Sequence, residues 1–82
     1  MGRRNIVGNR VREARKGARP PITQTDLAAR LQVLGIAIDQ PGVSKIESGQ
    51  RPVSDIEVGA LAEALRVTIS WLFEETDAAS MA

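Results

Sequence analysis

Residues that can start helices recur along this chain at short and nearly even intervals. Thr23, Asp39 and Ser54 each precede a segment in which apolar residues repeat at helical spacing, and their side-chain oxygens can accept hydrogen bonds from the first N–H groups of a helix. Ser54 also has the spacing of a capping box with the glutamate three residues later. Thr68 or Ser70 can start one more helix. The segments between these start residues are short, so each can form a helix of only a few turns.

The apolar periodicity predicts an all-α fold, with five short helices around one core. The predicted helices cover residues 5–16, 24 to near 35, 40–48, a segment that starts after Ser54 and a segment that starts near 68. The expected buried residues include Leu27, Leu31 and Leu34 in the second helix and Val43 and Ile46 in the third. The sequence contains no internal repeat and no alternating apolar stretch long enough to predict a β-strand, so nothing in it indicates another architecture.

Composition excludes several classes of function. The 82 residues include no cysteine and no histidine, so disulfides, cysteine-ligated zinc and the commonest general base are excluded. No pair of carboxylates and no glycine loop forms a recognisable catalytic motif, which predicts a protein that is not an enzyme and uses no metal or cofactor. No apolar run approaches the roughly 20 residues of a membrane span, so we expect a cytoplasmic protein without membrane contact.

Charge is unevenly distributed, although the formal net charge is only +1. Residues 1–22 carry seven basic residues against Glu13 alone, whereas residues 49–82 carry two basic and six acidic residues. A basic front and an acidic back suit a protein that presents one face to a polyanion. Solvated helix faces alone would give the same pattern, and a near-neutral domain lacks the high pI of a strong nucleic-acid footprint. Charge therefore leaves both interpretations open.

The predicted second and third helices have the arrangement of a helix-turn-helix, in which a short connection joins two helices. In this motif the first helix packs across the second and touches phosphates. The second helix offers its exposed N-terminal side chains to base edges in the major groove of DNA. The free N–H groups of a helix N-terminus also favour phosphate oxygens.

Four stretches of the sequence carry a more specific signal. They are residues 8–15 (GNRVREAR), 22–28 (ITQTDLA), 43–51 (VSKIESGQR) and 60–67 (ALAEALRV), followed by Trp71 and Leu72. In this order and spacing the chain resembles the XRE, or lambda-repressor-like, family of helix-turn-helix regulators over roughly residues 5–74. The resemblance implies a compact five-helix DNA-binding domain at 5–75, with a basic arm at 1–4 and a disordered tail at 76–82.

The chain departs from the family pattern in two places. Between Leu31 and Asp39 it has several residues more than the usual tight turn, as in a subgroup of the family with a longer second helix and connection. Pro41 and Gly42 occupy the first turn that would face DNA, and neither has a side chain able to read a base. We interpret Gly42 as a gap that lets the third helix approach the groove closely.

The resemblance assigns roles to polar side chains near the two helix starts. It implies that Gln24, which opens the second helix, binds a phosphate and braces Gln40, which opens the third. Gln40, Ser44 and Lys45 lie along one side of the third helix, and their side chains suit base edges. The alternatives are that both glutamines are merely exposed and that Lys45 contacts a phosphate.

Further phosphate contacts are expected around the helix connections. The predicted set of phosphate-binding residues is Thr23, Gln24, Gln50, Arg51 and Arg19. For Arg51 the alternative is a cation that only compensates the C-terminal dipole of the third helix. The family also pairs an arginine that ends its first helix with a glutamate that closes its third. The resemblance therefore implies a structural ion pair between Arg15 and Glu47.

The consecutive apolar residues Trp71, Leu72 and Phe73 cannot all face one core. We expect one of them to cap the core, and Trp71 and Phe73 are the candidates for a dimer seam. Family members usually bind two-fold operators as homodimers, because half-sites one helical turn apart require two copies. The resemblance thus implies a homodimer.

The sequence predicts a transcriptional regulator, bacterial or phage-encoded, that binds double-stranded DNA through residues 40–48, most simply as a repressor. The alternative is an antitoxin or another protein-interaction module on the same fold, for which DNA binding is secondary. The Pro41-Gly42 pair and the near-neutral charge favour this alternative. A steep salt dependence of binding would favour the DNA interpretation, because apolar docking does not weaken with ionic strength.

Overall fold

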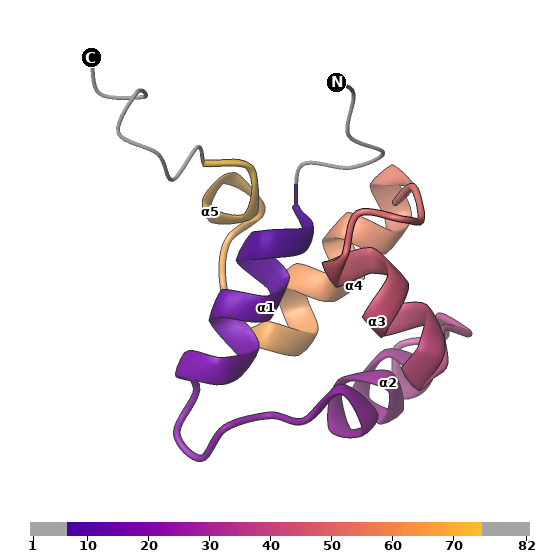
Figure 1. The fold of residues 1–82 in the computed structure, drawn as a ribbon, viewed down its shortest axis with the longest axis horizontal. Helices are drawn as coiled ribbons and strands as arrows, with labels where there is room; N and C mark the ends of the chain where they lie inside the picture. Colours follow the sequence, from indigo (N-terminus) through magenta and orange to yellow (C-terminus); the bar gives the residue numbers. More distant parts are fainter. Residues whose placement is uncertain (1–6, 75–82) are drawn as a thin grey trace.

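The computed structural model describes residues 7–74, which form helices and loops without a strand (Figure 1). The helices are α1 (Gly8–Gly17), α2 (Gln24–Val33), α3 (Gln40–Glu47), α4 (Asp55–Leu65) and α5 (Ile69–Phe73). The predicted all-α fold with five helices is confirmed. The predicted arm at 1–4 and tail at 76–82 lie outside the described residues.

Side-chain caps start four of the helices at the expected positions. Thr23 Oγ1 accepts the Asp26 N–H at 3.0 Å, and the Asp26 carboxylate accepts the Thr23 N–H at 3.2 Å. Ser54 forms the same reciprocal capping box at the start of α4. Asp39 accepts an N–H of the first turn of α3 at 3.0 Å, and Thr68 caps α5. These caps satisfy N–H groups that have no partner within their own helix.

The first helix begins later than predicted. It starts at Gly8 instead of residue 5, and Val7 stands at its N-cap position without a side-chain hydrogen bond. Valine has no oxygen that could cap the helix, and residues 5 and 6 lie outside the described residues. After Gly17 the chain turns back, and the Ile22 N–H donates to the Arg15 carbonyl at 3.0 Å.

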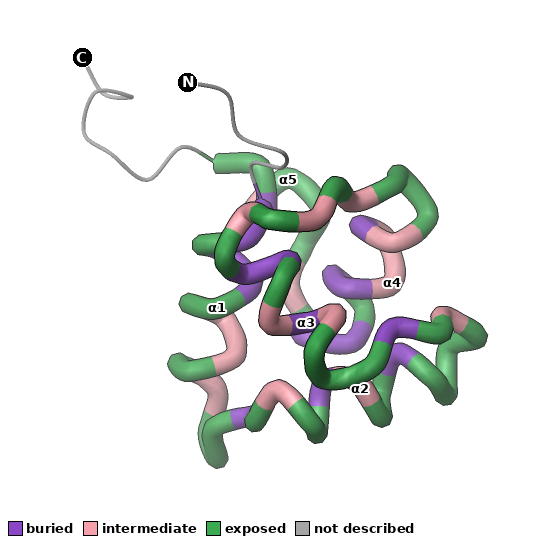
Figure 2. Tube along the Cα trace, turned by 45° about the vertical axis from the view of Figure 1, so that its right-hand side comes forward, coloured by how far each residue is buried: buried purple, intermediate pink, exposed green. Residues whose placement is uncertain are grey.

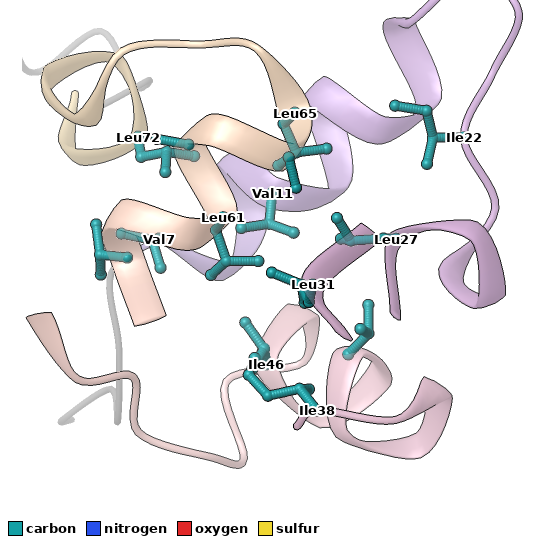
Figure 3. Packing of buried hydrophobic residues seen from close by; sticks show 14 residues of the cluster. Val7, Val11, Ile22, Leu27, Leu31, Ile38, Ile46, Leu61, Leu65 and Leu72 are labelled. Carbon is teal, nitrogen blue, oxygen red and sulfur yellow. The ribbon is translucent and has the colours of Figure 1, made fainter. Parts of the chain in front are cut away.

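All five helices contribute to one core (Figure 3). Figure 2 shows the buried residues on the inner sides of the helices, with exposed residues along their outer sides. The completely buried apolar side chains are Val11, Leu27, Leu31, Ile46, Leu61 and Leu72. Each fully buried side chain of this size contributes roughly 1.5–3 kcal/mol of transfer free energy. The core therefore fixes α2 and α3 against α1 and α4.

The prediction that Leu34 continues the buried stripe of α2 is wrong. The helix ends at Val33, and Gly35 adopts a left-handed φ of 86° that turns the chain away. Leu34 is consequently exposed, and Ile38 from the connection fills the core instead. The residues added between the two helices thus act partly as core, through Ile38 and the half-buried Ile36.

Gly42 has a packing role within the fold, and its interpretation as a gap facing DNA stays a prediction. A Cβ on this residue would lie 2.8 Å from the Ile38 side chain and 3.1 Å from Asp39 Oδ1. Ile38 is buried and Asp39 is the N-cap of α3, so displacing either side chain would destabilise the fold. The missing side chain makes room inside the fold for the start of α3.

We predict that Gly42→Ala destabilises the protein by about 1–3 kcal/mol, because overpacking against Ile38 exceeds the gain in helix propensity. Gly59→Ala is the matched control, since Gly59 lies within α4 and a Cβ there meets nothing within 4 Å. That control should stabilise the protein by about 0.5–1 kcal/mol. Urea denaturation followed by circular dichroism measures both changes. Stabilisation by both substitutions would contradict the packing role of Gly42.

Arg10 holds the short α5 against α1. Its side chain is only 10% exposed. The Arg10 Nε donates to the Trp71 carbonyl at 3.0 Å, and the guanidinium carbon lies 3.6 Å from the centre of the Trp71 ring. The terminal nitrogens donate to Glu13 at 3.2 Å and to Glu74 at 3.0 Å. Cation–π and charge-assisted contacts therefore supplement the apolar packing of this five-residue helix.

Candidate nucleic-acid interface

A chain of hydrogen bonds joins the starts of α2 and α3 to the end of α3. Gln40 Nε2 donates to Gln24 Oε1 at 2.8 Å, and Gln24 Nε2 donates to Glu47 Oε1 at 3.1 Å. Because the amide of Gln40 is held by the amide of Gln24, the first side chain of α3 has a fixed direction. This is the bracing contact that the resemblance implies for the two glutamines.

The chain of hydrogen bonds ends on the buried pair of Arg15 and Glu47. Arg15 Nε and one terminal nitrogen donate to the two carboxylate oxygens of Glu47 at 2.7 and 2.9 Å. The remaining terminal nitrogen donates to the Ile22 carbonyl at 3.1 Å. The hydrogen bonds to Glu47 raise the pKa of the Arg15 guanidinium against the effect of burial. The two residues thus form the ion pair that the family resemblance implies.

The exposed side of α3 presents three of the predicted site residues. Gln40 and Lys45 are exposed and Ser44 is half-buried, while Val43 and Ile46 face the core. Within residues 7–74, no carboxylate lies within ion-pair distance of Lys45. A glutamine, a serine and an uncompensated lysine can donate hydrogen bonds to base edges or to phosphates.

A hollow of about 280 Å³ lies beside α3, and we call it the recognition hollow. Its lining residues are Arg12, Arg15, Lys16, Gln24, Ser44, Glu47 and Ser48, from α1, α2 and the end of α3. Arg12 and Lys16 are exposed, and no described carboxylate pairs with either. Their charges therefore remain available to an anion that enters the hollow.

Arg12 and Lys16 were not among the predicted site residues. The two residues stand four positions apart on one side of α1, a spacing that places their side chains next to each other. This spacing alone also fits an ordinary solvated helix face. Only the packing of α1 against α3 brings them to Ser44 and to Gln24 at the start of α2, which the local pattern does not reveal.

Arg51 is engaged within the protein. Its terminal nitrogens donate to the two carboxylate oxygens of Glu57 at 3.1 and 3.0 Å and to the Pro52 carbonyl at 3.0 Å. The hydrogen bonds with Arg51 lower the pKa of Glu57, and the same contacts raise the pKa of Arg51. Much of the positive charge of Arg51 is thus compensated by its partner, an arrangement that the sequence analysis did not anticipate.

The remaining predicted phosphate-binding residues fall into two groups. Gln50 is exposed in the turn after α3, where Gly49 has a φ of 78°. Thr23 caps α2 next to Gln24. Arg19 lies elsewhere, because it lines a different hollow on the side of the loop that joins α1 to α2. The structure therefore does not bring Arg19 together with the recognition hollow.

The two candidates for a dimer seam have different surroundings. The Trp71 ring is partly buried against the core and lies under Arg10. Phe73 is 43% exposed, and Ile69, one helical turn earlier, is 50% exposed. Leu72 is completely buried and caps the core. The exposed apolar face of α5 therefore consists of Ile69 and Phe73, and the sequence analysis had not named Ile69.

Among residues 7–74 there is no cluster of three or more acidic side chains that could hold a metal ion. None of the helices in that part of the chain is long and apolar enough to cross a membrane.

Comparison with known families gives one match. A sequence profile of the helix-turn-helix family matches residues 11–72, which include all of α2, α3 and α4. Searches of curated proteins and of solved structures returned no match. The matched region contains the whole chain of hydrogen bonds from Gln40 to Arg15 and the recognition hollow.

Proposed function

This chain belongs to the XRE, or lambda-repressor-like, helix-turn-helix family of DNA-binding transcription regulators, and from this premise we propose that it reads a specific duplex sequence with α3 in the major groove. The proposal rests mainly on one observation. Gln40, at the exposed start of α3, is braced by Gln24, which is itself held by Glu47. A side chain fixed in advance loses little conformational entropy when it binds a base edge.

We propose that Gln40, Ser44 and Lys45 contact base edges. Glutamine suits adenine, lysine suits the O6/N7 edge of guanine and serine can serve either. Gly42, in the first turn of α3, packs against Ile38 and Asp39 and has no side chain that could contact a base. The reading side chains then come from the start of the helix and from its second turn.

We propose that the recognition hollow receives a backbone phosphate. Arg12, Lys16 and Gln24 supply donors around it, and an anion there would replace water near two uncompensated cations. Thr23 and Gln50 are further phosphate contacts in this proposal. Arg51 is paired with Glu57 and is not among the proposed phosphate contacts. Phosphate contacts set the register of the protein on DNA and do not specify sequence.

The experiment is a titration of labelled duplexes by fluorescence anisotropy at two salt concentrations. The duplexes are a mixed sequence and the region upstream of the protein's own coding sequence. Binding should be tighter on one sequence, and Gln40→Ala/Lys45→Ala should weaken that binding by about tenfold to a hundredfold. Binding without sequence preference would contradict base reading. Absence of binding by the folded protein at low salt would contradict the proposed function.

We further propose that the protein binds DNA as a homodimer and represses transcription by occupying its site. Ile69 and Phe73 form an exposed apolar pair on α5, and α5 is fixed to α1 by Arg10. A two-fold operator would then place one copy on each half-site. This activity belongs in the cytoplasm of a bacterium or of a phage host.

We predict that Phe73→Ser weakens self-association by about tenfold or more, because a buried phenylalanine contributes roughly 1.5–3 kcal/mol. Sedimentation velocity over a range of concentrations, with and without an operator duplex, measures this change. Ser70→Ala is a control on the same helix that removes no apolar surface. A protein that stays monomeric both free and on DNA would contradict the dimer.

A protein-interaction module, for example an antitoxin, is the second candidate. It is favoured by the exposed Val33 and Leu34 at the end of α2, which form an apolar patch beside the connection to α3. Docking of apolar surface does not weaken as ionic strength rises, whereas contacts with several phosphates do. The two salt concentrations in the titration therefore separate the two candidates.

A further inference from the structure

The cations of the described residues fall into three groups. Arg10, Arg15 and Arg51 are paired with glutamates. Arg12, Lys16 and Lys45 lie at the recognition hollow or on the exposed side of α3. The remaining cations are Arg19, Arg30 and Arg66, and all three line one other hollow. The proposed DNA contacts do not account for the third group.

This second hollow, which we call the basic hollow, lies between the α1–α2 loop, α2 and the end of α4. Its volume is about 410 Å³. Its lining residues are Ala18, Arg19, Pro20, Pro21, Ile22, Asp26, Arg30, Leu65 and Arg66. Ile22 and Leu65 belong to the core, so the hollow combines apolar lining with three guanidinium groups.

The guanidinium groups of the basic hollow have no acidic partner among the described residues. Within residues 7–74, no carboxylate lies within ion-pair distance of Arg19, Arg30 or Arg66. The carboxylate of Asp26 is engaged by the Thr23 N–H. Three arginines and one aspartate line the hollow, so its net charge is positive and attracts an anion.

Two of the three arginine side chains, those of Arg19 and Arg30, donate to backbone carbonyls. Arg30 donates to the Ala64 carbonyl at 2.9 Å, which ties α2 to the end of α4. Arg66 follows α4 in a left-handed conformation with a φ of 60°, which directs the chain sharply out of the helix. Guanidinium groups can bind phosphate or carboxylate groups with paired hydrogen bonds.

The basic hollow opens on a different side of α2 from the recognition hollow. Asp26 and Arg30 follow Gln24 by two and six residues, which corresponds to rotations of roughly 200° and 240° around the helix axis. One wall is formed by the end of α4, a helix that carries Asp55, Glu57 and Glu63 and no cation within its bounds. A small anion would fit within the hollow without extending over α4.

We propose that the basic hollow binds a small organic anion. Its phosphate or carboxylate group contacts Arg30 and Arg66, with Arg19 at the rim, and its apolar part packs against Ile22 and Leu65. The volume of the hollow lies within the range of small-molecule sites in proteins. This site is separate from the proposed DNA contacts, and it stands whether or not the chain reads DNA.

The test is a titration of the ¹⁵N-labelled protein with phenyl phosphate and with inorganic phosphate at constant ionic strength, followed by NMR. Saturable shifts are expected at the amides of Ala18, Arg19, Ile22, Arg30, Leu65 and Arg66, since Pro20 and Pro21 have no N–H group. Phenyl phosphate should bind about tenfold more tightly than inorganic phosphate, because its ring can reach the apolar lining. Equal affinity would overturn the organic part of the proposal. Shifts centred on the recognition hollow, or no saturation, would overturn the site itself.

The matched variants remove two cations from either hollow. Arg30→Gln/Arg66→Asn should weaken binding of phenyl phosphate by about tenfold or more, and asparagine tolerates the left-handed conformation at position 66. Arg12→Gln/Lys16→Gln removes the same charge elsewhere and should change the affinity by less than about twofold, because salt screens distant charges. Equal weakening by both pairs would overturn the site. If the first pair does not fold, Arg66→Asn alone is judged by the same comparison. It should still weaken binding of phenyl phosphate more than the control pair does.

Discussion

Replacing Glu47 with alanine is expected to lower the free energy of unfolding by about 3–5 kcal/mol, which is most of what a domain of this size has. The Glu47 side chain is only 5% exposed and accepts two hydrogen bonds from Arg15 and one from Gln24. Its removal leaves the Arg15 guanidinium buried without its anion. Urea denaturation followed by circular dichroism at neutral pH measures the loss.

Glu13→Ala is the control for this substitution. Glu13 also pairs with an arginine, but its side chain is 58% exposed, so water can replace it. The expected loss is within about 1 kcal/mol. If Glu47→Ala left the denaturation midpoint unchanged, or if both variants lost the same stability, the buried pair could not be a main support of the fold.

The second large effect concerns the recognition hollow. Arg12→Gln/Lys16→Gln should reduce affinity for duplex DNA by about tenfold to a hundredfold at low salt. It should also make the plot of log affinity against log salt shallower by about 2, because each lost phosphate contact removes roughly 0.9 from the slope. Fluorescence anisotropy at four or more salt concentrations would measure both quantities.

Arg30→Gln/Arg66→Asn is the matched control on the other side of α2, since it removes the same formal charge from the basic hollow. It should leave the salt slope nearly unchanged, because its cations touch no phosphate in the proposed complex. An equal loss of affinity and slope from both pairs would mean that net charge, and not the recognition hollow, governs binding.

The helices and their caps could be predicted from the sequence because they depend on neighbouring residues. Thr23, Asp39 and Ser54 cap helices with N–H groups only a few residues away. The pairing of Arg15 with Glu47 spans 32 residues, and no local pattern contains it. The family resemblance supplied that pair and the contact between Gln24 and Gln40.

The features that escaped prediction depend on how distant segments pack. Leu34 follows the helical period, but the turn at Gly35 removes it from the core. Gly42 is explained by the side chain of Ile38, which approaches α3 from the connection. The roles of Arg12 and Arg10 likewise appear only when α1 is packed against α3 and α5.

The most direct test of the central claim is to map the surface that meets DNA. The ¹⁵N-labelled protein is titrated with its preferred duplex, and changes in amide shifts are followed by NMR. The largest changes should fall at Arg12, Lys16 and Gln24, and along residues 40–50 apart from Pro41, which has no N–H group. Changes confined to residues 18–22 and 65–66, or to α5, would show that another surface binds DNA and would contradict the proposed role of α3.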